Sequence, residues 1–65
     1  MRVRYFEDTD TLLIELRGVP VAETRDLDEN TVIDFDAKGN VCSITIEHAS
    51  VRADAPKFSF EKVAA

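Results

Sequence analysis

Apolar and polar positions alternate along most of this chain with a period of two residues, as in half-buried β-strands. The clearest example runs from Thr31 to Ala49, where two β-branched, alternating stretches flank a polar segment that contains Gly39. This arrangement predicts a β-hairpin. We expect the remaining strands to assemble around it.

The loop length of this hairpin decides which residues face each other. A four-residue loop over 36–39 places Ile33 opposite Cys42 and keeps the apolar residues of both strands on one face. A three-residue loop would pair Ile33 with Ser43 and send the two apolar sets to opposite faces. We therefore favour the four-residue loop, with Gly39 in the left-handed conformation that such loops need.

A second hairpin is predicted at the N-terminus. Val3 and Tyr5 alternate with polar residues, residues 7–10 form a polar turn, and Leu12 and Ile14 alternate in the strand that follows. Pairing Tyr5 with Leu12 and Val3 with Ile14 gives another four-residue loop and one shared apolar face. The two hairpins therefore predict consistent registers.

The rest of the chain adds shorter elements. We expect an edge strand over 21–27, a helical turn or loop over 49–55, and a final strand over 57–63. The predicted fold is mainly β, a small antiparallel meander sheet of about five strands with short turns, in which residues 1–65 form one small domain. The predicted apolar face comprises Val3, Tyr5, Leu12, Ile14, Leu16, Ile33, Phe35, Cys42, Ile44, Ile46, Phe58 and Phe60.

A single sheet cannot leave such a face in water. It must curl on itself, take a cover from residues 49–56, or pack against another copy. The opposite face keeps Phe6, Leu13, Val32 and Val41, which is more apolar surface than a solvated face needs. We predict an interaction surface there.

Chain length points to oligomerisation. A chain of 65 residues buries only about 60% of its unfolded surface, so its own core is marginal. Small domains recover the deficit with disulfides, metals or oligomerisation. A single cysteine excludes an intrachain disulfide, and one cysteine with one histidine cannot complete a zinc site without carboxylates or a second chain. A homodimer is the expectation.

The charge balance limits the class of partner. With 13 acidic and 8 basic residues the net charge is −5, which argues against nucleic acid and against anionic membrane surfaces. A basic protein or a cation is the expected partner. No apolar run approaches the ~18 residues of a membrane span, and the N-terminus lacks the apolar core of a signal peptide. A cytoplasmic location is therefore expected.

Acidic residues supply weak candidates for a cation site. Asp34, Asp36 and Gly39 resemble part of a calcium-binding loop, but Lys38 and Thr45 stand where oxygen ligands are required. Hairpin-turn chemistry explains the same residues. Carboxylates of two subunits could still converge on a cation, and for this the candidates are Glu23, Asp34 and Asp36.

No catalytic set is recognisable. Cys42 and His48 would have to meet to form a nucleophile pair, but six residues along one strand separate them by about 20 Å. We therefore predict no catalytic residues, no cofactor and no enzymatic activity.

Several segments together resemble one family, the small prokaryotic proteins called domain of unknown function 2283. The segments that carry the resemblance are Met-Arg-Val-Arg-Tyr at residues 1–5, Asp-Thr-Leu-Leu-Ile-Glu-Leu at 10–16, Pro-Val-Ala-Glu-Thr-Arg at 20–25, Val-Ile-Asp-Phe-Asp-Ala-Lys-Gly-Asn-Val at 32–41 and Ile-Thr-Ile-Glu-His-Ala-Ser at 44–50. Phe6 and His48 stand where the family pattern leads us to expect acidic residues. The resemblance implies a short, β-rich, cytoplasmic prokaryotic protein, and it brings no established activity, cofactor or catalytic residue.

Members of that family are reported beside genes for small toxin-like proteins, which implies an antitoxin-like or other interaction role. From the residues and the resemblance together we expect a non-enzymatic, oligomerising protein-interaction module. The alternative is a protein that binds a small ligand or a metal cation at a site formed between subunits.

Overall fold

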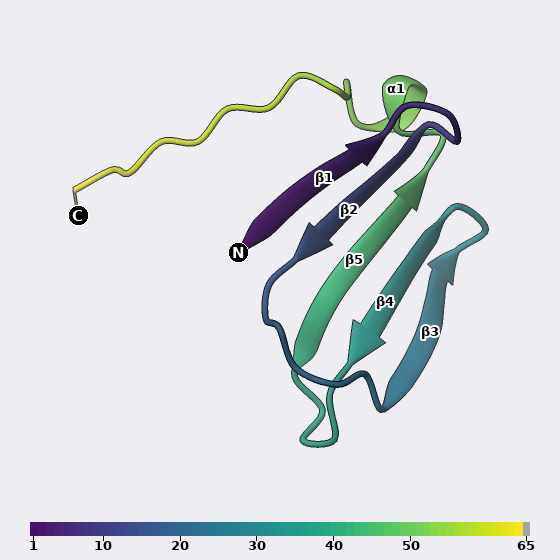
Figure 1. The fold of residues 1–65 in the computed structure, drawn as a ribbon, viewed down its shortest axis with the longest axis vertical. Helices are drawn as coiled ribbons and strands as arrows, with labels where there is room; N and C mark the ends of the chain where they lie inside the picture. The colour runs from purple at the N-terminus through teal and green to yellow at the C-terminus, as the bar shows by residue number, and fades with distance from the viewer. Residues whose placement is uncertain (65) are drawn as a thin grey trace.

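The computed structural model describes residues 1–64 and shows one five-stranded antiparallel sheet with a short helix at one end (Figure 1). The predicted mainly-β antiparallel fold is confirmed. The elements are β1 (Arg2–Phe6), β2 (Thr11–Glu15), β3 (Glu23–Asp28), β4 (Thr31–Phe35), β5 (Val41–Glu47) and α1 (Ala49–Arg52).

The strand order, β1-β2-β5-β4-β3, interrupts the meander once. After β2 the chain crosses the end of the sheet through residues 16–22 and reaches the far edge, where β3 begins (Figure 1). Pro20 lies in this connection, as expected for a residue without a backbone donor. The backbone N–H of Leu16 donates to the carbonyl oxygen of Cys42 at 2.7 Å, which ties the start of the connection to β5. In this strand order the longest strand, β5, is the central one, with β2 and β4 as its neighbours.

The N-terminal hairpin has the predicted register. Tyr5 pairs with Leu12 and Val3 with Ile14 across a four-residue loop over 7–10. Side-chain alternation in the two strands was sufficient to place these apolar residues on one face.

The predicted register of the central hairpin is wrong. The N–H of Asp36 donates to the carbonyl oxygen of Asn40 at 2.9 Å, and Phe35 pairs with Val41, so the loop holds only three residues. Gly39 has a φ of +83°, which confirms its predicted left-handed conformation. A three-residue loop whose last residue is left-handed is a common type of β-hairpin connection.

A three-residue loop alone would send the apolar residues of β4 and β5 to opposite faces, and a β-bulge prevents this. The register shifts between Phe35, paired with Val41, and Asp34, paired with Ser43, so that Cys42 is the extra residue. Beyond the bulge Ile33 pairs with Ile44, so the apolar residues of β4 and β5 still share one face.

The helix α1 is fixed to the end of the sheet by Asp10. Its carboxylate accepts hydrogen bonds from the hydroxyl of Tyr5 at 2.6 Å and from the hydroxyl of Ser50 at 2.7 Å. These bonds to the charged form lower the pKa of Asp10, the Tyr5 bond contributing most. Ala49 and Ala55 become buried at this junction. The predicted cover by residues 49–56 thus exists, but only at one end of the sheet.

The predicted final strand over 57–63 is not a strand. Residues 57–64, here called the C-terminal arm, have no regular secondary structure and extend from α1 along the outer side of β1 (Figure 1). Phe58 and Phe60 are 64% and 74% exposed. The alternation of the arm has the period of a strand, but a strand also needs a neighbouring backbone to pair with.

Candidate interaction surface

One face of the sheet, here called the first face, carries an apolar row across four strands. Pairing aligns Val3, Ile14, Ile44 and Ile33 side by side, and directly opposite residues project to the same face. A parallel row on the same face consists of Tyr5, Leu12, Ile46 and Thr31. The aliphatic side chains of both rows are only partly buried, because no helix or second sheet lies over them in residues 1–64 and residues 57–64 reach only the β1 end of the face.

Charged side chains of the first face gather at the β3 edge and pair with each other. Arg25 donates two hydrogen bonds of 3.0 Å to the carboxylate of Glu23, and its guanidinium lies 4.6 Å from the ring centre of Phe35. The same pairing lowers the pKa of Glu23. Arg52 of α1 bonds Asp28 at 2.9 Å. The first face therefore has an apolar centre and a rim whose charges are matched.

The opposite face, here called the second face, is polar and internally bonded. Asp34 accepts hydrogen bonds from the hydroxyls of Ser43 and Thr24, both at 2.6 Å, and these bonds lower its pKa. Arg4 lies 3.6 Å from the carboxylate of Glu15. Such a face meets water without leaving polar groups unsatisfied.

Three of the four residues predicted as an interaction surface lie on this second face. Leu13 and Val32 both pair with Thr45 and are only partly buried, while Phe6 is 37% exposed at the end of β1. Val41 is different, because the bulge pairs it with Phe35 of the first face. The predicted set is thus split between the two faces. Its proposed role in binding stays a prediction.

The three weak cation candidates are engaged within the chain. Glu23 bonds Arg25 on the first face, whereas Asp34 bonds Ser43 on the second face. The third, Asp36, accepts hydrogen bonds from the turn N–H groups of residues 38 and 40, and the bond from residue 40 contributes most to its lowered pKa. In residues 1–64 no three side chains of metal-ligating type form a group that could hold a metal ion. Cation binding between subunits stays a prediction.

Cys42 and His48 lie at opposite ends of β5. Cys42 sits in the bulge with 1% of its surface exposed, and burial raises the pKa of its thiol. His48 is the left-handed residue before α1, with a φ of 55°. A buried, protonated thiol is a weak nucleophile.

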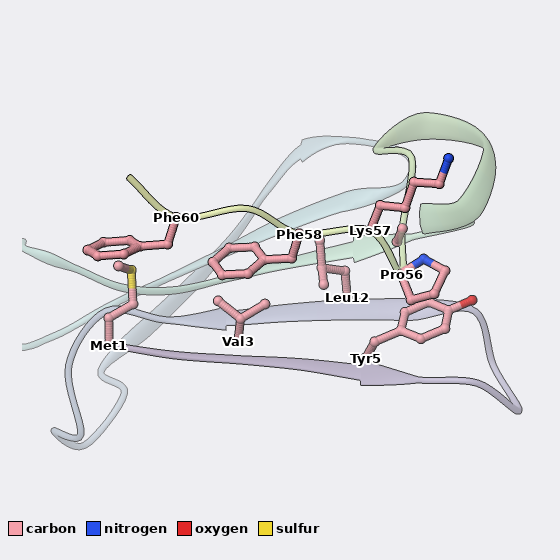
Figure 2. Close-up of a pocket in the computed structure, with 9 residues that line it drawn as sticks. Met1, Val3, Tyr5, Leu12, Pro56, Lys57, Phe58 and Phe60 are labelled. Carbon is pink, nitrogen blue, oxygen red and sulfur yellow. The ribbon is translucent and has the colours of Figure 1, made fainter. Parts of the chain in front are cut away.

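A groove runs along β1 on the first face, between the sheet and the C-terminal arm. Its volume is about 560 Å³, and Val3, Tyr5 and Leu12 line the sheet side. Phe58 and Phe60 line the arm side, and Figure 2 shows their rings above Val3 and Met1. We call it the β1 groove. The sequence showed the alternation of Phe58 and Phe60, but nothing in the sequence indicated that they would form the wall of a groove.

The fold and these surfaces define a class of protein, a small β protein built on one antiparallel sheet. A family model described as Protein of unknown function (DUF2283) matches residues 2–50. The chain belongs to this family. The match spans all five strands and ends within α1, so the C-terminal arm lies outside it.

No curated protein and no solved structure matches the chain. None of the helical residues described in the structure forms a stretch that is long and apolar enough to cross a membrane.

Proposed function

We propose that this protein is a non-enzymatic protein-interaction module that works as a homodimer, in which the first faces of two copies pack together. The observation that carries the proposal is the apolar row of Val3, Ile14, Ile44 and Ile33, which no helix or second sheet of residues 1–64 covers and over which the C-terminal arm reaches only at Val3. Two sheets packed face to face form a sandwich, the usual way for such a face to leave water.

The chain exposes more surface than a compact monomer of its mass. A compact monomer of 7.3 kDa exposes about 4,200 Å² by the usual scaling of surface with mass. This chain exposes 5098 Å². The excess of about 900 Å² includes the extended C-terminal arm, whose Phe58 and Phe60 are 64% and 74% exposed, as well as the uncovered part of the first face.

The placement of charge supports the first face as the interface. Its charged residues at the β3 edge, Glu23 and Arg25, are already paired, so burying them at a rim leaves no charge without a partner. On the second face, charged residues are distributed over several strands, from Arg4 on β1 to Asp26 on β3. In a dimer joined by first faces the second face stays in water. Leu13 and Val32 are then available to a further partner, for which the net charge of −5 favours a basic protein.

Two adjacent residues of β2 test this assignment, because they point to opposite faces. Ile14→Asp places a charge in the apolar row, and Leu13→Asp places the same charge on the second face. We expect Ile14→Asp to weaken dimerisation at least about tenfold and Leu13→Asp to change it less than about threefold. Sedimentation equilibrium measures both dissociation constants, and circular dichroism checks that both variants are folded.

A folded, fully monomeric wild-type chain at high micromolar concentration would overturn the proposal. Loss of the dimer in Leu13→Asp with an unchanged Ile14→Asp dimer would move the interface to the second face. If both variants unfold, the milder pair Ile14→Thr and Leu13→Thr gives the same comparison with less strain on the strand.

A further inference from the structure

The C-terminal arm is fixed to the end of the sheet at its base. Ala55 is 7% exposed, and its N–H donates to the carbonyl oxygen of Ala49 at 3.3 Å. The N–H of Lys57 donates to the carbonyl oxygen of Asp54 at 3.1 Å. Among the described residues, no backbone hydrogen bond joins residues 58–64 to the sheet. The arm can therefore move about its base without breaking a hydrogen bond of the sheet.

Beyond this base, two aromatic side chains of the arm face the sheet. Figure 2 shows the rings of Phe58 and Phe60 between the arm backbone and β1, above Val3 and Met1. Together with Val3 and Leu12 they line the β1 groove of about 560 Å³. The two phenylalanines are still 64% and 74% exposed. Apolar surfaces of one chain thus face each other across an open space.

Closing this space within one chain is favourable. When the arm moves toward the sheet, apolar surface leaves the water on both sides of the groove, and the groove disappears. Lys57 is the only charged side chain that lines the groove, and Figure 2 shows it at the base of the arm, pointing away from the sheet. Closure therefore buries no charge.

We propose that the C-terminal arm is a strap that closes over its own chain, with Phe58 and Phe60 packed onto Val3 and Leu12, and that the closed strap competes with a second copy for this end of the first face. The competition rests on the proposed homodimer. Two sheets packed face to face lie about 10 Å apart, and their side chains fill the space between them. A strap over Val3 and Leu12 occupies the same layer, so it must lift before a second sheet covers β1.

The strap would then regulate how much of the protein is able to dimerise. The apparent affinity for a second copy falls in proportion to the fraction of chains whose first face is free. The family match ends at residue 50, so the strap lies outside the part of the chain that the family model describes. Substitutions in the strap should therefore leave the sheet intact and change only the access to its first face.

The first test detects closure within one chain. Full-length ¹³C-labelled chain is diluted with excess unlabelled chain, so that nuclear Overhauser effects between two ¹³C-bound protons arise only inside one copy. A closed strap predicts such effects between the ring of Phe58 and the methyl groups of Val3 and Leu12. Phe58→Ser should shift these methyl signals, because the ring current is lost. Val63→Ser is the matched control, because Val63 lies on the same arm and is 75% exposed but does not line the groove.

The second test measures the competition. Sedimentation equilibrium should show a dissociation constant of the dimer at least about threefold lower for Phe58→Ser/Phe60→Ser than for the wild type, because the first face is then free in every chain. Val63→Ser should change the dissociation constant less than about twofold. Circular dichroism checks that each variant is folded.

The outcomes separate the strap from the homodimer. Absence of intrachain contacts between Phe58 and the methyl groups of Val3 and Leu12 overturns closure, whether or not the chain dimerises. A dissociation constant that is unchanged or raised in Phe58→Ser/Phe60→Ser overturns the competition and leaves the homodimer standing. A wild-type chain that stays monomeric at high micromolar concentration overturns the homodimer, and the competition with it.

Discussion

The two faces of this sheet come from the same strands, yet they satisfy their side chains in different ways. On the second face Asp34 is held between the hydroxyls of Thr24 and Ser43, both at 2.6 Å. On the first face Ile33 and Ile44 lie side by side, and no second layer within residues 1–64 covers them.

The difference shows where the stability of a one-layer protein must come from. Hydrogen bonds on the second face are complete within one chain and add modestly to stability, about 1 kcal/mol each at most sites. Aliphatic side chains on the first face contribute fully to the free energy of unfolding only when another surface excludes water from them. The polar groups of the second face are hydrogen-bonded within one chain, whereas the apolar centre of the first face has no covering layer within residues 1–64.

The largest expected effect on stability comes from truncating an apolar side chain at the centre of the first face. Ile44→Ala should lower the free energy of unfolding by about 2 kcal/mol or more, because the proposed dimer fully buries this side chain. Thr45→Ala, one residue along the same strand and on the second face, should cost less than about 1 kcal/mol. Urea denaturation at several protein concentrations measures both, and equal losses would contradict the contrast between the faces.

The next effect tests the turn that sets the register of both faces. Gly39→Val places a β-branched residue at a φ of +83° and should cost roughly 1–3 kcal/mol. Gly18→Val is the control, because Gly18 has ordinary backbone geometry and open space around its Cα. Thermal unfolding followed by circular dichroism compares the two variants. An unchanged midpoint of thermal unfolding for Gly39→Val would contradict the left-handed conformation assigned to Gly39 in the central hairpin loop.

The smallest effect concerns pH and the second face. Hydrogen bonds from Ser43 and Thr24 lower the pKa of Asp34 in the folded protein. The stability that follows from a lowered carboxyl pKa is present above the unfolded value of about 4 and is lost as pH falls through the folded value. Asp34→Asn should therefore be less stable than wild type at pH 7, with the difference shrinking below pH ~4. Parallel melting curves between pH 7 and pH 2.5 check this, and a constant difference would contradict it.

Alternation along the strands was enough to predict much of the fold. It gave the register of the N-terminal hairpin, with Tyr5 opposite Leu12, and placed Ile33 and Ile44 on the same face. It also indicated that the apolar face needed a cover. These features depend on a local rule, since successive side chains of a strand point to opposite sides whatever surrounds them.

The candidate surface was harder to predict for a reason visible at Val41. The sequence placed it on the second face by counting residues, but the bulge at Cys42 pairs it with Phe35 on the first face. A four-residue loop without a bulge and a three-residue loop with a bulge both keep the apolar residues of β4 and β5 on one face. The alternation in the sequence therefore cannot distinguish between them. The β1 groove likewise depends on where the arm leaves α1.

The sequence by itself therefore determined the strands within residues 2–47 and the face that most of their apolar residues occupy. It misplaced Val41, and it assigned to residues 57–63 a strand that does not form. Only the tertiary structure decided that β5 lies at the centre, that α1 closes one end, and that the C-terminal arm stays unpaired. The physical reason is the distance along the chain over which each feature is decided. Side-chain alternation is fixed by neighbouring residues, whereas strand order and pairing depend on hydrogen bonds between segments far apart in the chain.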